Sequence, residues 1–91
     1  MIDVEHQINL YLERARKREV ENHNKMEEGY WKICGSDGKP LRRIFYGSFI
    51  RAISFAIGQR GFNVLEGRLE RTNLKELKDK QNNYEIIKNH I

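Results

Sequence analysis

The chain of 91 residues contains one cysteine, one proline and no long apolar run. A lone cysteine, Cys34, allows neither an internal disulfide nor a site of several thiolates, which is the pattern expected in a reducing cytosol. No apolar run approaches the roughly 20 residues that span a bilayer, and the polar sequence MIDVEHQ lacks the apolar centre of a signal peptide. We therefore expect a cytoplasmic protein without a membrane partner.

Motifs of enzymes and cofactor sites are also missing. The sequence has no phosphate-binding loop, dinucleotide fingerprint or zinc-protease motif, and its serines lack a histidine and carboxylate in a recognisable order. Cys34 follows Ile33 in a strand-like segment, which is typical of an inert packed thiol. His6, His23 and His90 are too scattered to form a metal pair. We therefore expect no enzyme activity, no cofactor and no metal.

The densest apolar segment runs from Phe49 to Ile57, where only Arg51 and Ser54 are polar. A helix that is apolar on nearly all sides is buried on nearly all sides. Ser48 can cap its first turn, so we predict a buried central helix over 48–58. The residues predicted to be fully buried are Ile50, Ile53, Ala56 and Ile57.

Two β-prone runs flank Asp37-Gly38, a dipeptide typical of tight hairpin turns. They predict a hairpin with strands 30–35 and 40–46. With Asp37-Gly38 as the two turn residues, Lys32 lies opposite Arg43, and like charges directly opposed on a sheet are unfavourable. A bulge that shifts the register would relieve this repulsion, as would an acidic group, either a protein carboxylate or a bound phosphate.

The flanking segments supply the remaining elements. An apolar stripe at helical spacing predicts a helix over 2–24, followed by a connector at 25–29. Alternation of apolar and charged residues predicts a strand at 62–70, although this segment also fits a helix weakened by Gly67. A final apolar stripe favours a helix over 73–89. The chain is therefore expected to form a single small α+β domain, residues 1–91, in the order α-β-β-α-β-α, with the hairpin and one further strand packed on the central helix.

The tetrapeptide Gly58-Gln59-Arg60-Gly61 resembles the Gly-x-x-Gly loop with which KH domains clamp a nucleic-acid backbone. In KH domains that loop lies between two helices, whereas a strand is predicted to follow here. We therefore interpret the tetrapeptide as a helix-to-strand turn, in which Gly58 or Gly61 adopts a left-handed conformation.

Positive charge is concentrated in the middle of the chain. Residues 1–29 carry five basic and seven acidic side chains, whereas residues 38–71 carry seven basic and two acidic ones. Six of those seven are arginines, whose planar group suits phosphates but also suits ion pairs within a protein. The predicted binding residues are Lys39, Arg42, Arg43 and Arg60, with Lys32, Arg68 and Arg71 at the border.

These features predict a small binding or regulatory protein whose partner is nucleic acid, either DNA or RNA. Cations would bind phosphates, and aromatic rings of the hairpin would stack on bases unless they belong to the core. The alternative is an inhibitor or adaptor, of the kind that phages and mobile elements encode, which binds an acidic protein surface. A homodimer is a further expectation, since the apolar helices offer more apolar surface than one small sheet covers.

Overall fold

A computed structural model describes the chain at residues 3–18, 23–73, 75 and 84–88. The predicted α+β class and the order of the first five elements are confirmed. No helix in these ranges is long and apolar enough to cross a membrane. The elements are α1 (Val4–Arg18), β1 (Glu28–Cys34), β2 (Pro40–Ser48), α2 (Phe49–Ile57), β3 (Arg68–Thr72) and β4 (Glu85–Lys88).

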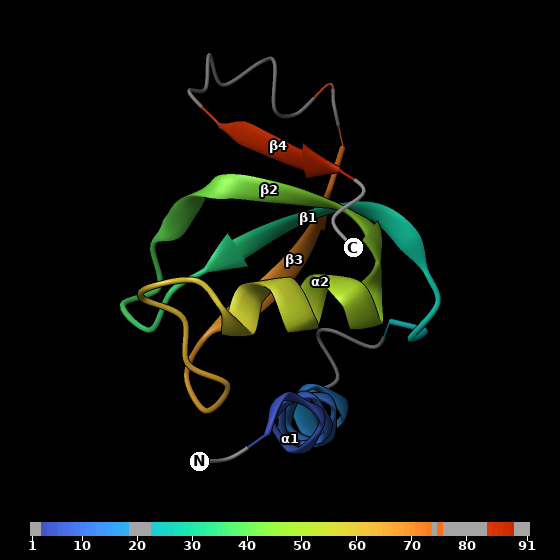
Figure 1. Cartoon of the computed structure of the whole chain (residues 1–91), viewed down its shortest axis with the longest axis vertical. Helices are drawn as coiled ribbons and strands as arrows, with labels where there is room; N and C mark the ends of the chain where they lie inside the picture. Colours follow the sequence, from blue (N-terminus) through green and yellow to red (C-terminus); the bar gives the residue numbers. More distant parts are fainter. Residues whose placement is uncertain (1–2, 19–22, 74, 76–83, 89–91) are drawn as a thin grey trace.

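The four strands form one mixed sheet in the order β3-β1-β2-β4. β1 is antiparallel to both β2 and β3, whereas β2 and β4 are parallel. Figure 1 shows α2 lying across one face of the sheet and α1, seen end-on, beneath α2. The main core therefore lies between the sheet and the two helices.

One side of α2 supplies the centre of this core. Ala52, Ile53 and Ala56 are inaccessible to solvent, and Phe49 is almost so. Burial was correctly predicted for Ile53 and Ala56, but Ile50 and Ile57 are only half-buried, and Arg51, Ser54 and Gly58 on another side are exposed. The helix is therefore buried on one side, within a single chain, rather than on nearly all sides. The core also contains Tyr11, Ala15, Trp31, Ile33, Phe45, Val64 and Leu69.

The N-terminus of α2 is closed by the chain itself. The Ser48 hydroxyl accepts a hydrogen bond from the Arg51 amide at 3.4 Å, which confirms the predicted cap. The Phe49 amide donates to the carbonyl of Glu27 at 2.8 Å, and the Ile50 amide donates to that of Lys25 at 2.9 Å. These bonds fasten the segment before β1 to α2 and use the amides that would otherwise attract an anion.

The register of the hairpin differs from the predicted one. Lys32 lies opposite Ile44 rather than Arg43, and the register shifts before Cys34, which lies opposite Pro40. The predicted juxtaposition of Lys32 and Arg43 was therefore wrong, and the bulge considered as its remedy is present. A turn dipeptide does not fix the register when the hairpin loop is longer than two residues.

The loop of the hairpin begins at Gly35, whose amide donates to the Lys39 carbonyl at 2.9 Å. Within it, the Gly38 amide donates to the Gly35 carbonyl at 2.9 Å, and Gly38 has a φ of 84°. Asp37 is in the loop, as predicted, and its carboxylate accepts from the Lys39 amide at 3.0 Å. Gly38 supplies the left-handed conformation that residues with a side chain rarely adopt.

The first helix is shorter than predicted. Among the described residues it ends at Arg18, and His23 and Asn24 are not helical. The Asn24 side chain accepts a hydrogen bond from the Met26 amide at 2.8 Å, a local turn that competes with helix. The predicted connector 25–29 was also too long, because β1 begins at Glu28.

The predicted strand 62–70 begins only at Arg68 and continues to Thr72. Asn63 explains the late start, because its side chain accepts from the Leu65 amide at 2.7 Å and its carbonyl accepts from the Glu66 amide at 3.0 Å. A side chain that bonds two residues ahead stabilises a turn. The preceding turn contains Gly61, with a φ of 93°, whereas Gly58 is right-handed.

The final helix predicted over 73–89 is wrong at residues 85–88, which form β4, and residues 74, 76–83 and 89 of that prediction lie outside the described residues. β4 pairs Ile86 with Ile44 and Ile87 with Phe45. β-Branched residues such as isoleucine favour strands. Two consecutive ones lie on opposite faces of the sheet, so each can pack on its own face. Here tertiary pairing with β2 outweighs the helical spacing of the apolar residues.

Candidate functional site

Two loops meet at one end of the molecule, on the left of Figure 1, where the green hairpin loop lies beside the gold loop after α2. The Ser36 amide donates to the Gly61 carbonyl at 3.0 Å across this junction. The hairpin and the α2–β3 loop each carry predicted binding residues to this end. We call the set Lys39, Arg42, Arg43 and Arg60 the basic end.

The bulge explains why two consecutive arginines of β2 are both exposed. Three residues of β2, Leu41–Arg43, stand opposite the single residue Ile33 of β1. In a regular strand, neighbouring side chains point to opposite faces, and one of the two arginines would point toward the core. The irregularity instead leaves Leu41 half-buried, while Arg42 and Arg43 both reach solvent.

Arg43 is held by two partners. Its Nε donates to Glu85 Oε1 of β4 at 3.0 Å, and a terminal nitrogen donates to Gln59 Oε1 at 3.1 Å. Arg43 and Glu85 have side chains that are 51% and 60% exposed, so their ion pair contributes little to stability. The pair does, however, offset one positive charge of the basic end and joins β2, β4 and the α2–β3 loop.

Lys39, Arg42 and Arg60 are exposed, and none of the three forms an ion pair with a residue that the structure describes. The nearest acidic side chain in the loop sequence is Asp37, whose carboxylate binds the backbone amide of Lys39 rather than its ammonium group. The predicted centre of the binding surface therefore contains three cations available to a partner.

Two of the predicted border residues neutralise a carboxylate instead. Lys32 Nζ lies 3.3 Å from Glu70 Oε1, and an Arg68 terminal nitrogen lies 2.6 Å from Glu70 Oε2. Lys32 faces Glu70 directly across the β1–β3 ladder, and its side chain is only 18% exposed. The acidic group expected near Lys32 is thus a protein carboxylate, so a bound phosphate is not required there.

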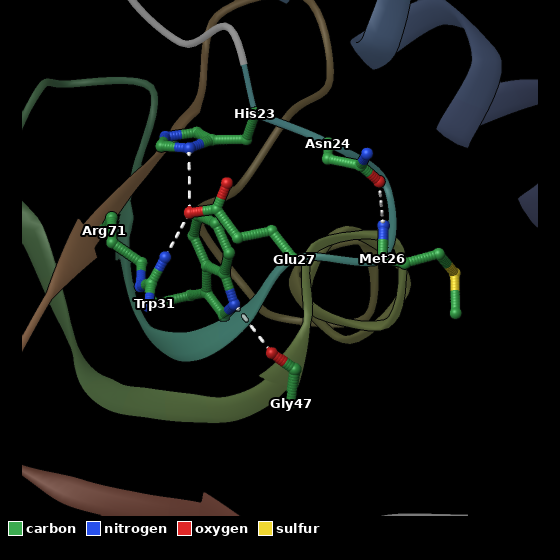
Figure 2. Close-up of polar contacts among 7 residues, drawn as sticks. All are labelled: His23, Asn24, Met26, Glu27, Trp31, Gly47 and Arg71. Atoms are coloured by element: carbon green, nitrogen blue, oxygen red, sulfur yellow. Dashed lines mark hydrogen bonds and ion pairs between the residues drawn. The ribbon is translucent and has the colours of Figure 1, made fainter.

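Arg71 lies at the other end of β1, in the cluster shown in Figure 2. Its guanidinium group binds the Glu27 carboxylate and lies 5.5 Å from the centre of the Trp31 ring. His23 Nδ1 lies 3.3 Å from the same carboxylate, and the indole of Trp31 donates to the Gly47 carbonyl at 2.9 Å. Arg71 therefore joins β3 to the start of β1 and lies apart from the basic end.

The aromatic residues of the hairpin separate into two groups. Trp31 and Phe45 belong to the core, with 0% and 3% of their surface exposed. Tyr30 and Tyr46 alternate with them and lie on the opposite face of the sheet, with ring centres 4.7 Å apart. The rings and arginines that alternate in the sequence are therefore not gathered into one surface.

Sequence reasoning missed the two residues that hold Arg43. The tetrapeptide at 58–61 predicts only a turn for Gln59, and the final apolar stripe predicts a helix for Glu85, so neither pattern connects these residues to β2. The parallel pairing of β2 with β4, which sets Arg43 opposite Glu85, has no local signal in the sequence. The two consecutive isoleucines, Ile86 and Ile87, were the available sign of a strand.

Neither metal ligands nor similarity to known proteins points to a function for this chain. Within the described ranges, no three histidine, cysteine, aspartate or glutamate side chains are close enough together to hold a metal ion. The chain matches no family model, no curated protein and no solved structure. The chemistry of the basic end is therefore the basis for a functional argument.

Proposed function

We propose that this chain is a small, non-enzymatic cytoplasmic protein that binds nucleic acid through the basic end. The observation that carries the proposal is that Lys39 before β2, Arg42 in β2 and Arg60 in the α2–β3 loop are exposed and without an ion pair among the described residues, on two segments that the bond from the Ser36 amide to the Gly61 carbonyl joins. Phosphate oxygens are the natural partners of such cations, because an arginine can donate two hydrogen bonds to one phosphate.

The proposal makes a quantitative statement about salt. Each phosphate contact to duplex DNA contributes about −0.9 to the slope of log affinity against log salt. Three contacts therefore give a slope of about −2.7, whose magnitude is used below, and a loss of about 40-fold between roughly 50 and 200 mM salt. If two of the three contacts are removed, the same change in salt lowers affinity only about 3- to 4-fold.

The test compares two double variants of equal charge. Arg42→Gln with Arg60→Gln removes two cations from the basic end, and Arg16→Gln with Lys17→Gln removes two exposed cations from α1. Fluorescence anisotropy with labelled DNA and RNA at several salt concentrations gives affinity and slope for each protein. Circular dichroism shows that the folds are equal. We expect the first variant to lose most of the slope and the second to resemble the parent.

Two results would overturn the proposal. Loss of binding in the α1 variant, with the basic end variant unchanged, would move the site to α1. Absence of binding to DNA and RNA even at low salt would favour the inhibitor or adaptor, for which the same cations would speed association with an acidic protein face.

Self-association is a separate proposal. The predicted homodimer rested partly on the apolar sequence of α2, but α2 buries its core residues within one chain. The small size of the chain still favours it, and the described residues expose the apolar side chains Val4, Met26, Tyr46, Leu65 and Ile86. Sedimentation at tens of micromolar tests it, and a mass near the 10.9 kDa of one chain would exclude the dimer.

A further inference from the structure

We infer that the basic end binds duplex DNA through its phosphate backbone alone, without a hairpin in the major groove and without bases stacked on protein rings. This inference rests on the proposed function and specifies its ligand. Three structural features support it: the attachment of the hairpin loop, the position of the aromatic rings and the use of the Gln59 amide.

The hairpin loop cannot act as a free ribbon. A two-stranded ribbon reads bases when its tip projects and enters the major groove. Here the Ser36 amide is bonded to the Gly61 carbonyl at 3.0 Å, so the tip lies against the α2–β3 loop. Figure 1 shows the green hairpin loop lying beside the first part of the gold α2–β3 loop. The surface that they form together presents cations to a backbone.

Stacking is also disfavoured at this surface. Proteins that bind single strands without sequence preference combine a basic groove with rings on which successive bases stack. Trp31 and Phe45 are buried, and Tyr30 pairs with Tyr46 on the sheet face opposite the helices. In β2, Tyr46 lies beyond Ile44 and Phe45 from the arginines, next to the junction with α2. Phe62, the ring closest to Arg60 in the sequence, is half-buried and packs against the core beside Tyr11, so a single strand at the basic end would gain charge contacts with little stacking.

Duplex DNA suits these groups best. It carries one negative charge for about every 1.7 Å of its axis, so each cation contributes more to the salt slope than on a single strand, about 0.9 against 0.7. Proteins recognise duplex RNA by its shape and by contacts to its 2′-hydroxyls as well as to its phosphates across the minor groove. The Gln59 amide is already used, since its oxygen accepts from Arg43 and its nitrogen donates to the Phe55 carbonyl at 3.5 Å.

The experiment measures anisotropy with four labelled probes of one mixed sequence, each about two helical turns or roughly 20 nucleotides long. The probes are duplex DNA, single-stranded DNA, duplex RNA and single-stranded RNA. We expect duplex DNA to bind most tightly and to give a slope of about 0.9 per contact, against about 0.7 for single strands. In a second measurement, unlabelled A·T-rich and G·C-rich duplexes should compete equally well, because no base is read.

The outcomes separate this inference from the proposed function. Single-stranded DNA that binds as tightly as the duplex would overturn the inference and indicate stacking. Tighter binding of duplex RNA would overturn the choice of DNA, and a preference of about fivefold or more between the two competitors would indicate a base contact. In each of these cases the Arg42→Gln, Arg60→Gln variant would still lose affinity, so the proposed function would stand. Failure of all four probes would remove both.

Discussion

The hydroxyl of Tyr11 on α1 accepts a hydrogen bond from the backbone amide of Leu69 on β3 at 2.7 Å. Both residues are almost completely buried. β3 is at one edge of the sheet, so α1 covers an amide that an exposed edge strand would offer to another chain. Tyr11 thus has two roles. Its ring packs in the core, and its hydroxyl binds a backbone amide at an edge of the sheet.

We predict that Tyr11→Phe destabilises the fold by about 1–3 kcal/mol, because it leaves the buried Leu69 amide without its acceptor while the ring still packs. Urea denaturation measures the change in the free energy of unfolding. The matched control is Tyr46→Phe, which removes a hydroxyl from a ring that is 38% exposed and should change stability by less than about 0.5 kcal/mol. Equal effects of the two substitutions would contradict this role for Tyr11.

We predict that Gly29→Ala displaces Arg71. A methyl group at Gly29 would collide with the guanidinium group of Arg71, which crosses β1 at this position. The displaced arginine would lose its contacts to Trp31 and Glu27, at a cost of about 1 kcal/mol for an exposed cation–π contact and ion pair together.

A double-mutant cycle tests this explanation by urea denaturation. In the Arg71→Ala background the collision is absent, so Gly29→Ala should cost clearly less than in the parent. Additive effects would show that the alanine acts on the backbone rather than through Arg71.

Local signals in the sequence predicted the central part of the fold. The apolar run and Ser48 located α2, and two β-prone runs around Asp37-Gly38 located the hairpin. The errors arose where a side chain or a distant strand decides the structure. Asn63 holds a turn within an alternating segment, and β4 forms because β2 offers a partner for Ile86 and Ile87. Neither effect is visible in helical or strand periodicity.

The excess of positive charge at the candidate site was predictable from composition, but the arrangement of its residues was not. The excess of arginine pointed to the segment that contains Arg42, Arg43 and Arg60, whose role in binding stays a prediction, and the Arg43–Gln59 contact places β2 beside the loop that carries Arg60. The register of the strands decides which cations lie beside a carboxylate. In the hairpin, that register depends on the bulge in β2. The sequence therefore placed Lys32 beside Arg43, whereas the strands place Lys32 beside Glu70 and Arg43 beside Glu85.

We predict that Glu70→Gln destabilises the fold by about 1–2 kcal/mol, because Lys32 and Arg68 lose their shared carboxylate and the Lys32 side chain is only 18% exposed. The control is Glu66→Gln in the exposed turn before β3, where we expect little change. Urea denaturation of both proteins at low salt measures the difference. Raising the salt should reduce it only in part, since a half-buried pair is screened less than an exposed one. Loss of stability in the Glu66 variant alone would contradict the assignment.

The last prediction concerns Arg42 and Arg43, the adjacent arginines of β2, which differ in their ion-pair partners. Arg42 has no ion pair among the described residues, whereas Arg43 is engaged by Glu85. We expect Glu85→Gln to remove the negative charge that offsets Arg43, leaving its neutral hydrogen bond to Gln59, and to increase the magnitude of the salt slope of DNA binding by up to about 0.9, one additional phosphate contact. In the double variant Arg43→Gln, Glu85→Gln the slope should return to the parent value, because no arginine is left to be released. An unchanged slope in the single variant would mean that Arg43 does not face the phosphate backbone, and would restrict the binding surface to Lys39, Arg42 and Arg60.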